Sequence, residues 1–477
     1  MVNKIFSAIM LSLLQISMFT LAVSIKPVTA SRTIYIQADG SIDPPTAPIS
    51  TVDNITYTFV GDIINETIVV KRHSVVVNGE DHILRGAGTG YGFHLFSNNV
   101  TVRNTRIVGF DCGILCDVDF GGESRIIGNT ISGNGIAIWM NSMDSTVDII
   151  NNTIRKNDHV GIYLESWCGC WGGRIVGNLV ADNREGIWLQ EVTCVLRNNI
   201  LRNNGLDVAG SYIDHFLQDI DASNTIDGKP ICYWRNKENK TVPLNAAYVA
   251  LVNCKKIIVE NLTLTGNGQG IVLAGTTDST VRNLNIAHNS QGIVLIESSH
   301  NRIYANNITN CSRPLVDFFG ANNMIYHNNF IHNYYSPWIS FSQDLLDGGY
   351  PFGGNYWSDY NGTDLYCGAH QNLNGSDGIG ETPYIIEELG GETYYMDRYP
   401  LMETWTPSWE PIPPLLTGDI NYDGKVDIYD IVYMASIYGC KEGDLDWNPF
   451  ADLAPQWGVI NIYDLVTCTY HYGETYP

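Results

Sequence analysis

The sequence is poor in charged residues, and basic residues are the scarcest. Only 16% of the 477 residues are charged, and 27 Lys and Arg oppose 50 Asp and Glu, which gives a formal net charge of −23. A chain this acidic repels polyphosphate, so we expect no nucleic acid partner, whereas cationic partners and divalent metals fit better. The lack of charge also disfavours a fold built of salt-bridged helices, and the frequent Asn and Gly residues favour tightly wound turns.

Long apolar runs are scarce as well. Only residues 5–23 are apolar over a length that approaches a membrane span. They follow Lys4 and precede the small-residue site Val28-Thr29-Ala30, a pattern that predicts a cleaved signal peptide over residues 1–30. An uncleaved membrane anchor is the alternative. We therefore expect a secreted protein, located outside the cell or at its surface.

The cysteine count and the glycosylation motifs agree with export. About ten Asn-X-Ser/Thr motifs are present, as expected of an exported glycoprotein. The 11 cysteines are an odd number, so at least one thiol should remain unpaired. Cys112 and Cys116 are close in sequence, as are Cys168 and Cys170, but the pairing cannot be deduced.

One short motif recurs along most of the chain: a glycine followed by alternating apolar residues. Successive copies are about 21 to 26 residues apart, within the range typical of solenoid proteins. They begin at Gly92, Gly113, Gly135, Gly161 and Gly186, and after an interruption the motif returns at Gly270 and Gly292.

Two further apolar segments complete each repeat, for example Ile149-Ile150 and Asn152-Thr-Ile. Three short strands per repeat can bury their apolar faces only if successive coils stack at roughly 4.8 Å. Equivalent Asn residues in stacked turns can form a hydrogen-bonded ladder. The sequence therefore predicts a mostly β parallel β-helix. A leucine-rich repeat would need spaced leucines and helices, and a β-sandwich would not repeat so regularly.

The repeat and its interruptions predict the domain boundaries. We expect a signal peptide at 1–30, an N-terminal cap with the first strands at 31–86, a parallel β-helix at 87–340 with an insert at 205–253, a C-terminal cap at 341–402, a Pro-rich linker at 403–416 and a small domain at 417–477.

The insert and the tail contain sequence motifs that are more specific than the repeats. They include Tyr212-Ile-Asp-His, Gly354-Asn-Tyr-Trp-Ser-Asp-Tyr and Asp397-Arg-Tyr-Pro. Over about residues 80–402, these phrases resemble the archaeal branch of the NosD-like β-helix family, also called the carbohydrate-binding and sugar-hydrolase β-helix. The resemblance implies a right-handed parallel β-helix. It does not fix an activity, because the family name derives from a protein tied to copper delivery while many relatives are presumed to bind sugars.

A calcium-loop pattern follows the linker. Its candidate ligands at positions 1, 3, 5, 7, 9 and 12 are Asp419, Asn421, Asp423, Lys425 (through its carbonyl), Asp427 and Asp430. Gly424 fills position 6, where an EF-hand loop turns sharply. The spacing predicts a calcium site, since this loop offers most of the oxygen ligands that the ion needs.

A second copy of this segment follows 34 residues later, from Ile460. Asp452, Asn461 and Asp464 match positions 1, 9 and 12 of its loop, but the loop is one residue too long and lacks the other ligands. We expect this second site to be weak, rearranged or empty. The duplication over about residues 417–474 resembles a type I dockerin, a small α-helical domain with two EF-hand-like loops. The resemblance implies a cohesin-like scaffold module as partner, and the chain's own β-helix is the alternative.

No familiar catalytic motif of β-helix enzymes is recognisable. The nearest candidates lie in the insert: Asp214, His215, Asp219 and Asp221. Asp219 and Asp221 would share one face of a strand, but solvated loop acids explain them equally well. If the chain is an enzyme, we expect a polysaccharide hydrolase or lyase.

Two other sets of side chains suggest ligands. Cys168, Cys170, His159 and Met140 have the chemistry of Cu(I) ligands, although structural cysteines are the favoured interpretation. Trp139, Trp167 and Trp188 could form a row of rings for sugars. We expect an exported β-helix protein that interacts with or processes polysaccharide and is attached through a calcium-dependent module. A non-catalytic envelope or adhesion protein and a copper-handling protein are the alternatives.

Overall fold

The computed structural model describes residues 32–117, 122–141, 146–166, 171–350, 352–368, 370–389, 392–406, 418, 420, 425–441, 451–454 and 458–475. The predicted signal peptide and most of the linker lie outside these ranges. No helix within them is long and apolar enough to cross a bilayer.

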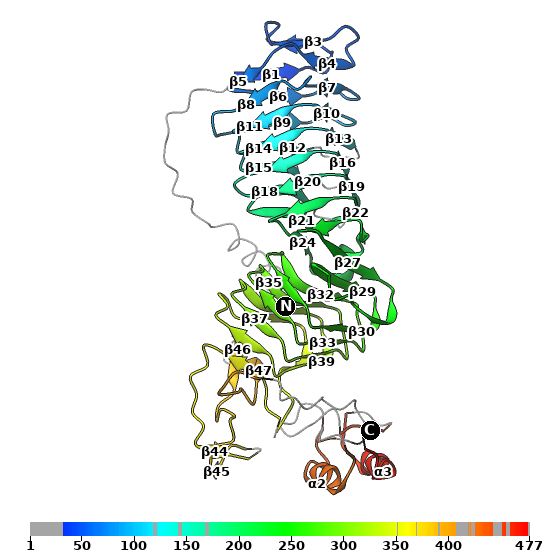
Figure 1. Ribbon diagram of the computed structural model, residues 1–477, viewed down its shortest axis with the longest axis vertical. Coiled ribbons are helices and arrows are strands. Elements are labelled where there is room, and N and C mark those ends of the chain that lie inside the picture. The colour runs from blue at the N-terminus through cyan, green and yellow to red at the C-terminus, as the bar shows by residue number, and fades with distance from the viewer. Residues whose placement is uncertain are drawn as a thin grey trace.

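The chain winds into coils that stack along an axis (Figure 1). Strands in neighbouring coils pair in parallel, as when Val102 pairs with Val77 on one side and Ile126 on the other. This pairing confirms the parallel β-helix.

The sheets run along the stack, each taking one strand from each coil. The first sheet holds β2 (Ile42–Asp43), β1 (Arg32–Ile36), β6 (Glu66–Val70), β9 (Tyr91–Leu95), β12 (Cys112–Cys116), β15 (Ile136–Asn141), β18 (Val160–Glu165), β21 (Glu185–Gln190) and β24 (Leu206–Ala209). The second holds β25 (Asp219–Ile220), β22 (Thr193–Arg197), β19 (Trp171–Val176), β16 (Thr146–Ile150), β13 (Glu123–Ile127), β10 (Thr101–Arg103), β7 (Val76–Asn78), β4 (Thr56–Phe59) and β3 (Ile49–Ser50).

The third sheet extends through the whole β-helix. Its order is β41 (Trp338–Ser340), β38 (Arg313–Phe318), β35 (Gln291–Ile296), β32 (Gln269–Ala274), β29 (Tyr248–Val252), β27 (Lys229–Arg235), β26 (Thr225–Ile226), β23 (Ile200–Arg202), β20 (Leu179–Ala181), β17 (Thr153–Arg155), β14 (Thr130–Ser132), β11 (Arg106–Val108), β8 (Ile83–Arg85) and β5 (Ile63–Ile64).

Two smaller sheets complete the later coils. One holds β28 (Glu238–Thr241), β30 (Lys255–Glu260), β33 (Thr280–Arg282), β36 (Arg302–Tyr304), β39 (Ala321–Tyr326) and β42 (Gln343–Leu345). The other holds β31 (Thr263–Thr265), β34 (Asn285–Ala287), β37 (Asn307–Thr309), β40 (Asn329–Ile331) and β43 (Tyr356–Trp357).

The predicted insert is the point where the chain reverses direction. Strands β26 and β27 pair antiparallel and join two stacks of coils (Figure 1). Asp227 and Gly228 connect these strands with φ angles of 49° and 80°, and positive φ at both central residues is typical of a type I′ hairpin turn. The 205–253 segment therefore adds strands to the solenoid, and the repeat resumes after the reversal.

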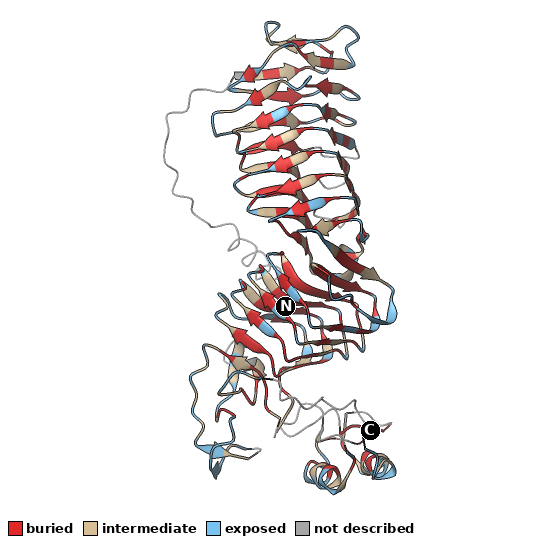
Figure 2. Ribbon diagram, viewed as in Figure 1, coloured by how far each residue is buried: buried red, intermediate tan, exposed pale blue. Residues whose placement is uncertain are grey.

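The core lies inside the coils, and buried residues recur on the strands of successive coils (Figure 2). In one interior column, Ile107, Ile131, Ile154, Val180 and Leu201 stack in register and are fully buried. Each such side chain contributes about 1.5–3 kcal/mol through burial. Repetition of these columns from coil to coil stabilises the solenoid.

The expected asparagine ladder is present. In one row, Asn129, Asn152, Asn178, Asn199 and Asn224 are buried, and each side-chain amide donates to the carbonyl oxygen of the next Asn side chain at 2.8–3.1 Å. Each also accepts from the backbone N–H of the preceding one. The ladder thus satisfies buried polar groups at one corner of each coil.

The C-terminal cap continues the last coil. Asn355 extends an asparagine ladder, and Trp357 stacks on Phe330 with ring centroids 4.2 Å apart. The fully buried Asp397 accepts from the Trp357 indole N–H at 2.9 Å. The cap also includes the strand pairs β44 (Tyr366–Cys367) with β45 (Leu373–Asn374) and β46 (Tyr384–Leu389) with β47 (Glu392–Asp397).

Trp405 belongs to the β-helix although it falls in the predicted linker of 403–416. Its ring stacks on His327 at a centroid distance of 3.6 Å. Its backbone exchanges hydrogen bonds of 2.7 and 2.8 Å with the Asn329 side chain.

The described part of the C-terminal segment contains two short helices, α2 (Ile428–Ser436) and α3 (Ile462–Tyr470). They share a small core of their own that includes Val426, Met434 and Cys468. Two antiparallel bridges, Lys425 with Thr475 and Lys441 with Val459, are related by the same 34-residue offset that the sequence shows. The segment therefore folds as a duplicated unit, which we call the C-terminal module.

Candidate functional site

An aromatic column, formed by Trp139, Tyr163 and Trp188, runs along the outer face of the first sheet. The three residues occupy outward positions of β15, β18 and β21, in register with one another. The ring centroids of Trp139 and Tyr163 are 6.1 Å apart, and those of Tyr163 and Trp188 are 4.6 Å apart; both pairs are stacked. All three side chains are half-buried, so part of the column faces solvent.

Two of these rings belong to the row that the sequence predicted. Trp167, the third predicted member, lies outside the described residues. Sequence reasoning missed Tyr163, although its signal was present: Gly161-Ile-Tyr-Leu places Tyr163 at the position that Trp188 holds in Gly186-Ile-Trp-Leu.

Glu165 fixes the orientation of the column. Its carboxylate accepts a hydrogen bond of 3.1 Å from the indole Nε1 of Trp139 and another from the Tyr163 hydroxyl. Burial and the hydrogen bond to Glu165 raise the pKa of the Tyr163 phenol. The phenol therefore remains a hydrogen-bond donor at physiological pH.

Asp207 occupies the next position of the same row, in register with Trp188 on the neighbouring strand β24. Gln269, from β32 of the second stack, donates its amide N–H to Asp207 Oδ1 and accepts the Tyr248 hydroxyl at 3.0 Å. Burial raises the pKa of Asp207 to about 7, and the charge of Glu185 adds to this effect. Burial also raises the pKa of Glu185.

This arrangement can exchange a proton beside an aromatic surface. Because its pKa is about 7, Asp207 is part protonated and part ionised at neutral pH. A carboxyl group with such a pKa can act as a proton donor or acceptor near neutrality. The geometry thus combines a surface for ring contacts with a titratable group at its end.

The four insert residues proposed as catalytic candidates separate into two places. Asp214 and His215 lie in a single 3₁₀ turn, η1 (Ile213–Phe216). The Nδ1 atom of His215 accepts from the backbone N–H of Ser211 at 3.3 Å, and its ring makes an edge contact with Tyr212 at 5.8 Å.

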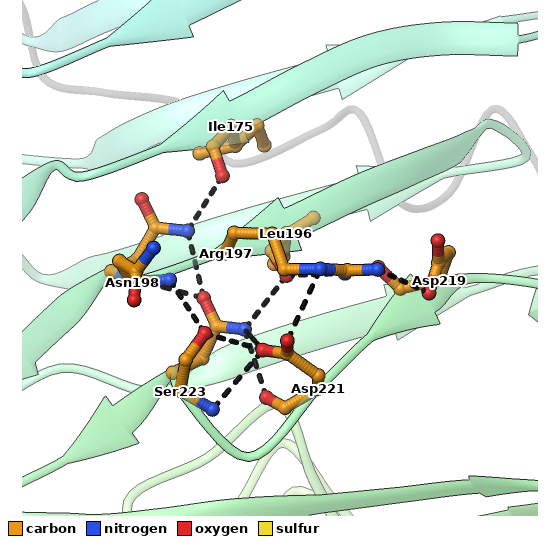
Figure 3. Close-up of polar contacts among 9 residues, drawn as sticks. Ile175, Leu196, Arg197, Asn198, Asp219, Asp221 and Ser223 are labelled. Atoms are coloured by element: carbon orange, nitrogen blue, oxygen red, sulfur yellow. Dashed lines mark hydrogen bonds and ion pairs between the residues drawn. The ribbon is translucent and has the colours of Figure 1, made fainter.

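Asp219 and Asp221 instead bind one guanidinium (Figure 3). Arg197 pairs with Asp219 at 2.7 Å and with Asp221 at 3.2 Å. Asp221 also accepts from the backbone N–H of Ser223 at 3.0 Å and from its hydroxyl. These contacts give the two carboxylates a structural role in joining β22 to β25, and their catalytic role remains a prediction.

A second aromatic surface lies beside the insert. Tyr212, Phe319 and Phe341 stack with centroid distances of 6.1 and 5.4 Å. Phe319 and Phe341 have φ angles of 60° and 55°, a left-handed conformation that costs bulky side chains about 1–3 kcal/mol. All three are among the exposed large side chains. The backbone thus holds two apolar rings in solvent despite this cost.

Comparison with known proteins identifies the family. Residues 29–211 and 224–362 match the family described as periplasmic copper-binding protein (NosD). The chain belongs to the NosD family. The matched region covers most of both stacks and ends before the C-terminal module.

One solved structure similar to this NosD-family chain is the A-module of mannuronan C-5 epimerase AlgE6 from Azotobacter vinelandii. The two are 14% identical, with coverage of 61% of this chain and 82% of the epimerase module and a TM-score of 0.21. No curated protein sequence matches the chain.

The copper candidates do not converge in the part of this NosD-family chain that the structure describes. Met140 points into the core, where it is in register with the buried thiol of Cys116. His159 lies half-buried before β18, and Cys168 and Cys170 lie outside the described residues. Among the described residues, no group of three or more His, Cys, Asp or Glu side chains is placed to hold a metal ion. Cys112 and Cys116 are free thiols on one strand.

In the C-terminal module, the helix that follows each predicted calcium loop is present. Asp427 and Asp430 form a capping box at the start of α2, and Asn461 and Asp464 do so at α3. Asp430 and Asp464 are fully buried.

The two buried carboxylates hold the backbone of the loops. Asp430 Oδ1 accepts from the N–H of Ile420, and Asp464 Oδ1 accepts from the N–H of Leu453, both at 2.7 Å. Asp452 Oδ2 accepts from Gly458 N at 2.6 Å. Lys425, whose backbone carbonyl is the predicted ligand at position 7, forms the antiparallel bridge with Thr475. Asp419, Asn421 and Asp423 lie outside the described residues, so calcium binding stays a prediction.

Proposed function

We propose that this NosD-family protein acts outside the cytoplasm and binds glycan along the aromatic column of its first stack. The observation that carries the proposal is the stacked surface of Trp139, Tyr163 and Trp188, oriented by Glu165 and ended by Asp207. Aromatic surfaces that carry a few fixed polar groups are typical of small-molecule and sugar subsites. The family description, which names a periplasmic protein, supports the location.

The charge of the protein narrows the class of glycan. With a net charge of −23 and three carboxyl groups, Glu165, Glu185 and Asp207, at the column, polyanionic chains would be repelled. Neutral or amino-sugar polymers are therefore the expected ligands.

Affinity electrophoresis of the full-length protein in gels containing neutral, amino-sugar or uronate polymers tests this proposal. We expect retardation by one of the first two classes and a loss of at least tenfold in affinity for Trp188→Ala. Tyr334→Ala, which removes a 79% exposed ring elsewhere, is the matched control and should bind as the wild type does. Equal binding by Trp188→Ala and wild type would refute a role for the column.

The protein would also cleave the bound glycan if Asp207 acts as a proton donor. A proton donor with a pKa of about 7 suits cleavage of a glycosidic bond. If the protein is a hydrolase or lyase acting here, Asp207→Asn should abolish release of reducing ends while glycan binding persists. Retained turnover in Asp207→Asn would exclude Asp207 as the donor.

Copper handling is the second candidate, and the family description favours it. His159 and the predicted ligands Cys168 and Cys170 would carry it. Competition of the reduced protein with a Cu(I) chelator measures the affinity directly. Binding that is lost in the Cys168→Ser/Cys170→Ser variant would support this function, and no competition by the wild type would exclude it.

The C-terminal module is proposed as the attachment device. Its duplicated, separately cored architecture agrees with a dockerin-like unit, and apolar side chains such as Tyr429 and Tyr463 are exposed on its helices. A cohesin-like scaffold module is the proposed partner, and the protein's own β-helix is the alternative. Pull-down of the full chain with cohesin-bearing beads, with and without calcium, distinguishes the two.

A further inference from the structure

Two buried aspartates meet in the last coils of the second stack, at positions where the repeat places other residue types. Asp317 lies on β38, and Asp344 lies on β42. Neither residue belongs to the aromatic column or to the predicted calcium loops. We refer to them as the acidic pair.

Asp317 interrupts an apolar column. Leu251, Leu273 and Leu295 precede it in register, Ile339 follows it, and all of these side chains are buried. Asp317 itself is 0% exposed, and the groups beside its carboxylate are the Asp344 carboxyl, the Ser342 hydroxyl and the backbone of Gly320. An isolated carboxylate in such surroundings is strongly destabilising unless its charge is compensated.

Asp344 ends an asparagine ladder. The side-chain amides of Asn301 and Asn323 each donate to a backbone carbonyl of a neighbouring coil, that of Thr276 and that of Ser298, at 2.7 Å. Asp344 takes the next place in this row and accepts from Asn323 at 2.7 Å. Having no amide hydrogen, its carboxylate cannot donate to the next carbonyl in turn.

Both carboxylates converge beside the Cα atom of Gly320. A Cβ atom at residue 320 would lie 2.4 Å from Asp317 Oδ1 and 2.4 Å from Asp344 Oδ2, so a larger residue there would displace both carboxyl groups. The side chain of Ser342 also lies beside Asp317. Within the described chain, no Lys, Arg or His forms an ion pair with either aspartate.

Two charges this close and this buried need either a proton or a cation. Burial raises the pKa of both carboxyl groups, and the charge of Asp317 raises the pKa of Asp344 further. A single shared proton would neutralise one of the two charges and leave the other buried. A divalent cation can contact both oxygens of Asp317 and one of Asp344, and it cancels both charges.

We propose that Asp317 and Asp344, together with the Ser342 hydroxyl, bind a divalent cation of the oxygen-preferring class, with Ca²⁺ as its representative. Carboxylate, carbonyl and hydroxyl oxygens are the ligands of hard cations, and the set contains no sulfur or imidazole that would favour copper or zinc. The ion would link the apolar column of β38 to the ladder that enters the cap.

The test compares the full-length protein with Asp317→Leu/Asp344→Asn. These substitutions restore the leucine of the column and the asparagine of the ladder, so the variant should fold. After equilibration with calcium and gel filtration, elemental analysis should show one ion fewer per chain in the variant. Chelation should lower the melting temperature of the β-helix in the wild type and leave that of the variant unchanged, because the C-terminal module is intact in both.

Equal ion counts would overturn the proposal. A shared proton would then be the occupant, and the wild type would lose stability relative to the variant as pH rises. If the double variant does not fold, Asp344→Asn alone decides the question, since Asn at this position is the ladder's own residue. Its ion count should be one lower than that of the wild type, and an unchanged count would again refute the site.

Discussion

At the residue scale, the protonation of Asp207 makes the stability of the junction between the two stacks depend on pH. Its folded pKa of about 7 exceeds the ordinary value of 3.8, so the folded state binds this proton more tightly than the unfolded state does. The resulting stabilisation is complete below pH 3.8 and is lost as pH rises through 7. For a half-buried group the loss should be about 2 to 4 kcal/mol.

Asp207→Asn should remove this pH dependence. The variant keeps an oxygen for the Gln269 amide and carries no titrating charge. Thermal melting between pH 4 and 8 should therefore give a shallower decline for the variant than for the wild type. Buried carboxyls distant from Asp207 titrate equally in both proteins, so the difference reports Asp207 together with its interaction with Glu185. Parallel curves would show that its pKa is not raised.

The same residues show what sequence could and could not reveal about the site. Trp139 and Trp188 were predictable because the repeat places both on outward positions of strands. Asp207 was not, because its partner Gln269 is distant in sequence and meets it only after the chain has reversed. The sequence suggested Asp219 and Asp221 as a catalytic carboxylate pair. Their partner Arg197, which binds both, lies in the preceding coil.

At the scale of elements, the asparagine ladder should contribute more stability than its exposed neighbours do. Asn152→Ala would remove the donor to Ile126 O and Asn178 Oδ1 and the acceptor used by Asn129. Leaving these buried groups without partners should cost about 2–4 kcal/mol. The matched control is the exposed Asn151→Gly, which suits the φ of 55° at that position. Guanidinium unfolding midpoints should fall for the first variant and stay within error for the second.

The kind of coil was predictable, and the reversal between the two stacks was not. Gly-apolar spacing determines how strands stack, and this is a local pattern. The change of direction depends on Asp227 and Gly228, a two-residue turn that resembles many others until its flanking strands are known to pair. Likewise, the sequence predicted that Trp405 belongs to the Pro-rich linker, because its contact with His327 exists only in the folded chain.

At the scale of the whole molecule, that contact fixes where the β-helix ends. A chain truncated after Thr406 keeps the Trp405 stack and the hydrogen bonds to Asn329, whereas one truncated after Met402 loses both. We expect the first to melt at the temperature of the full-length β-helix and the second to melt several degrees lower. Identical melting of the two truncated chains would show that Trp405 contributes nothing to stability.

Calcium should act on the two parts of the molecule independently. The sequence fills every candidate ligand position in the first loop of the C-terminal module, and the structure gives the module its own core. Calcium titration by calorimetry should therefore show more bound ions for the full-length chain than for the chain truncated after Thr406, which retains only the acidic pair. A matched change, Asp423→Ala in the full-length chain, should remove the tighter module site and leave the β-helix transition unaltered. If both chains bind calcium equally, the module's loops are not calcium sites, and its attachment role would have to rest on the exposed helix faces alone.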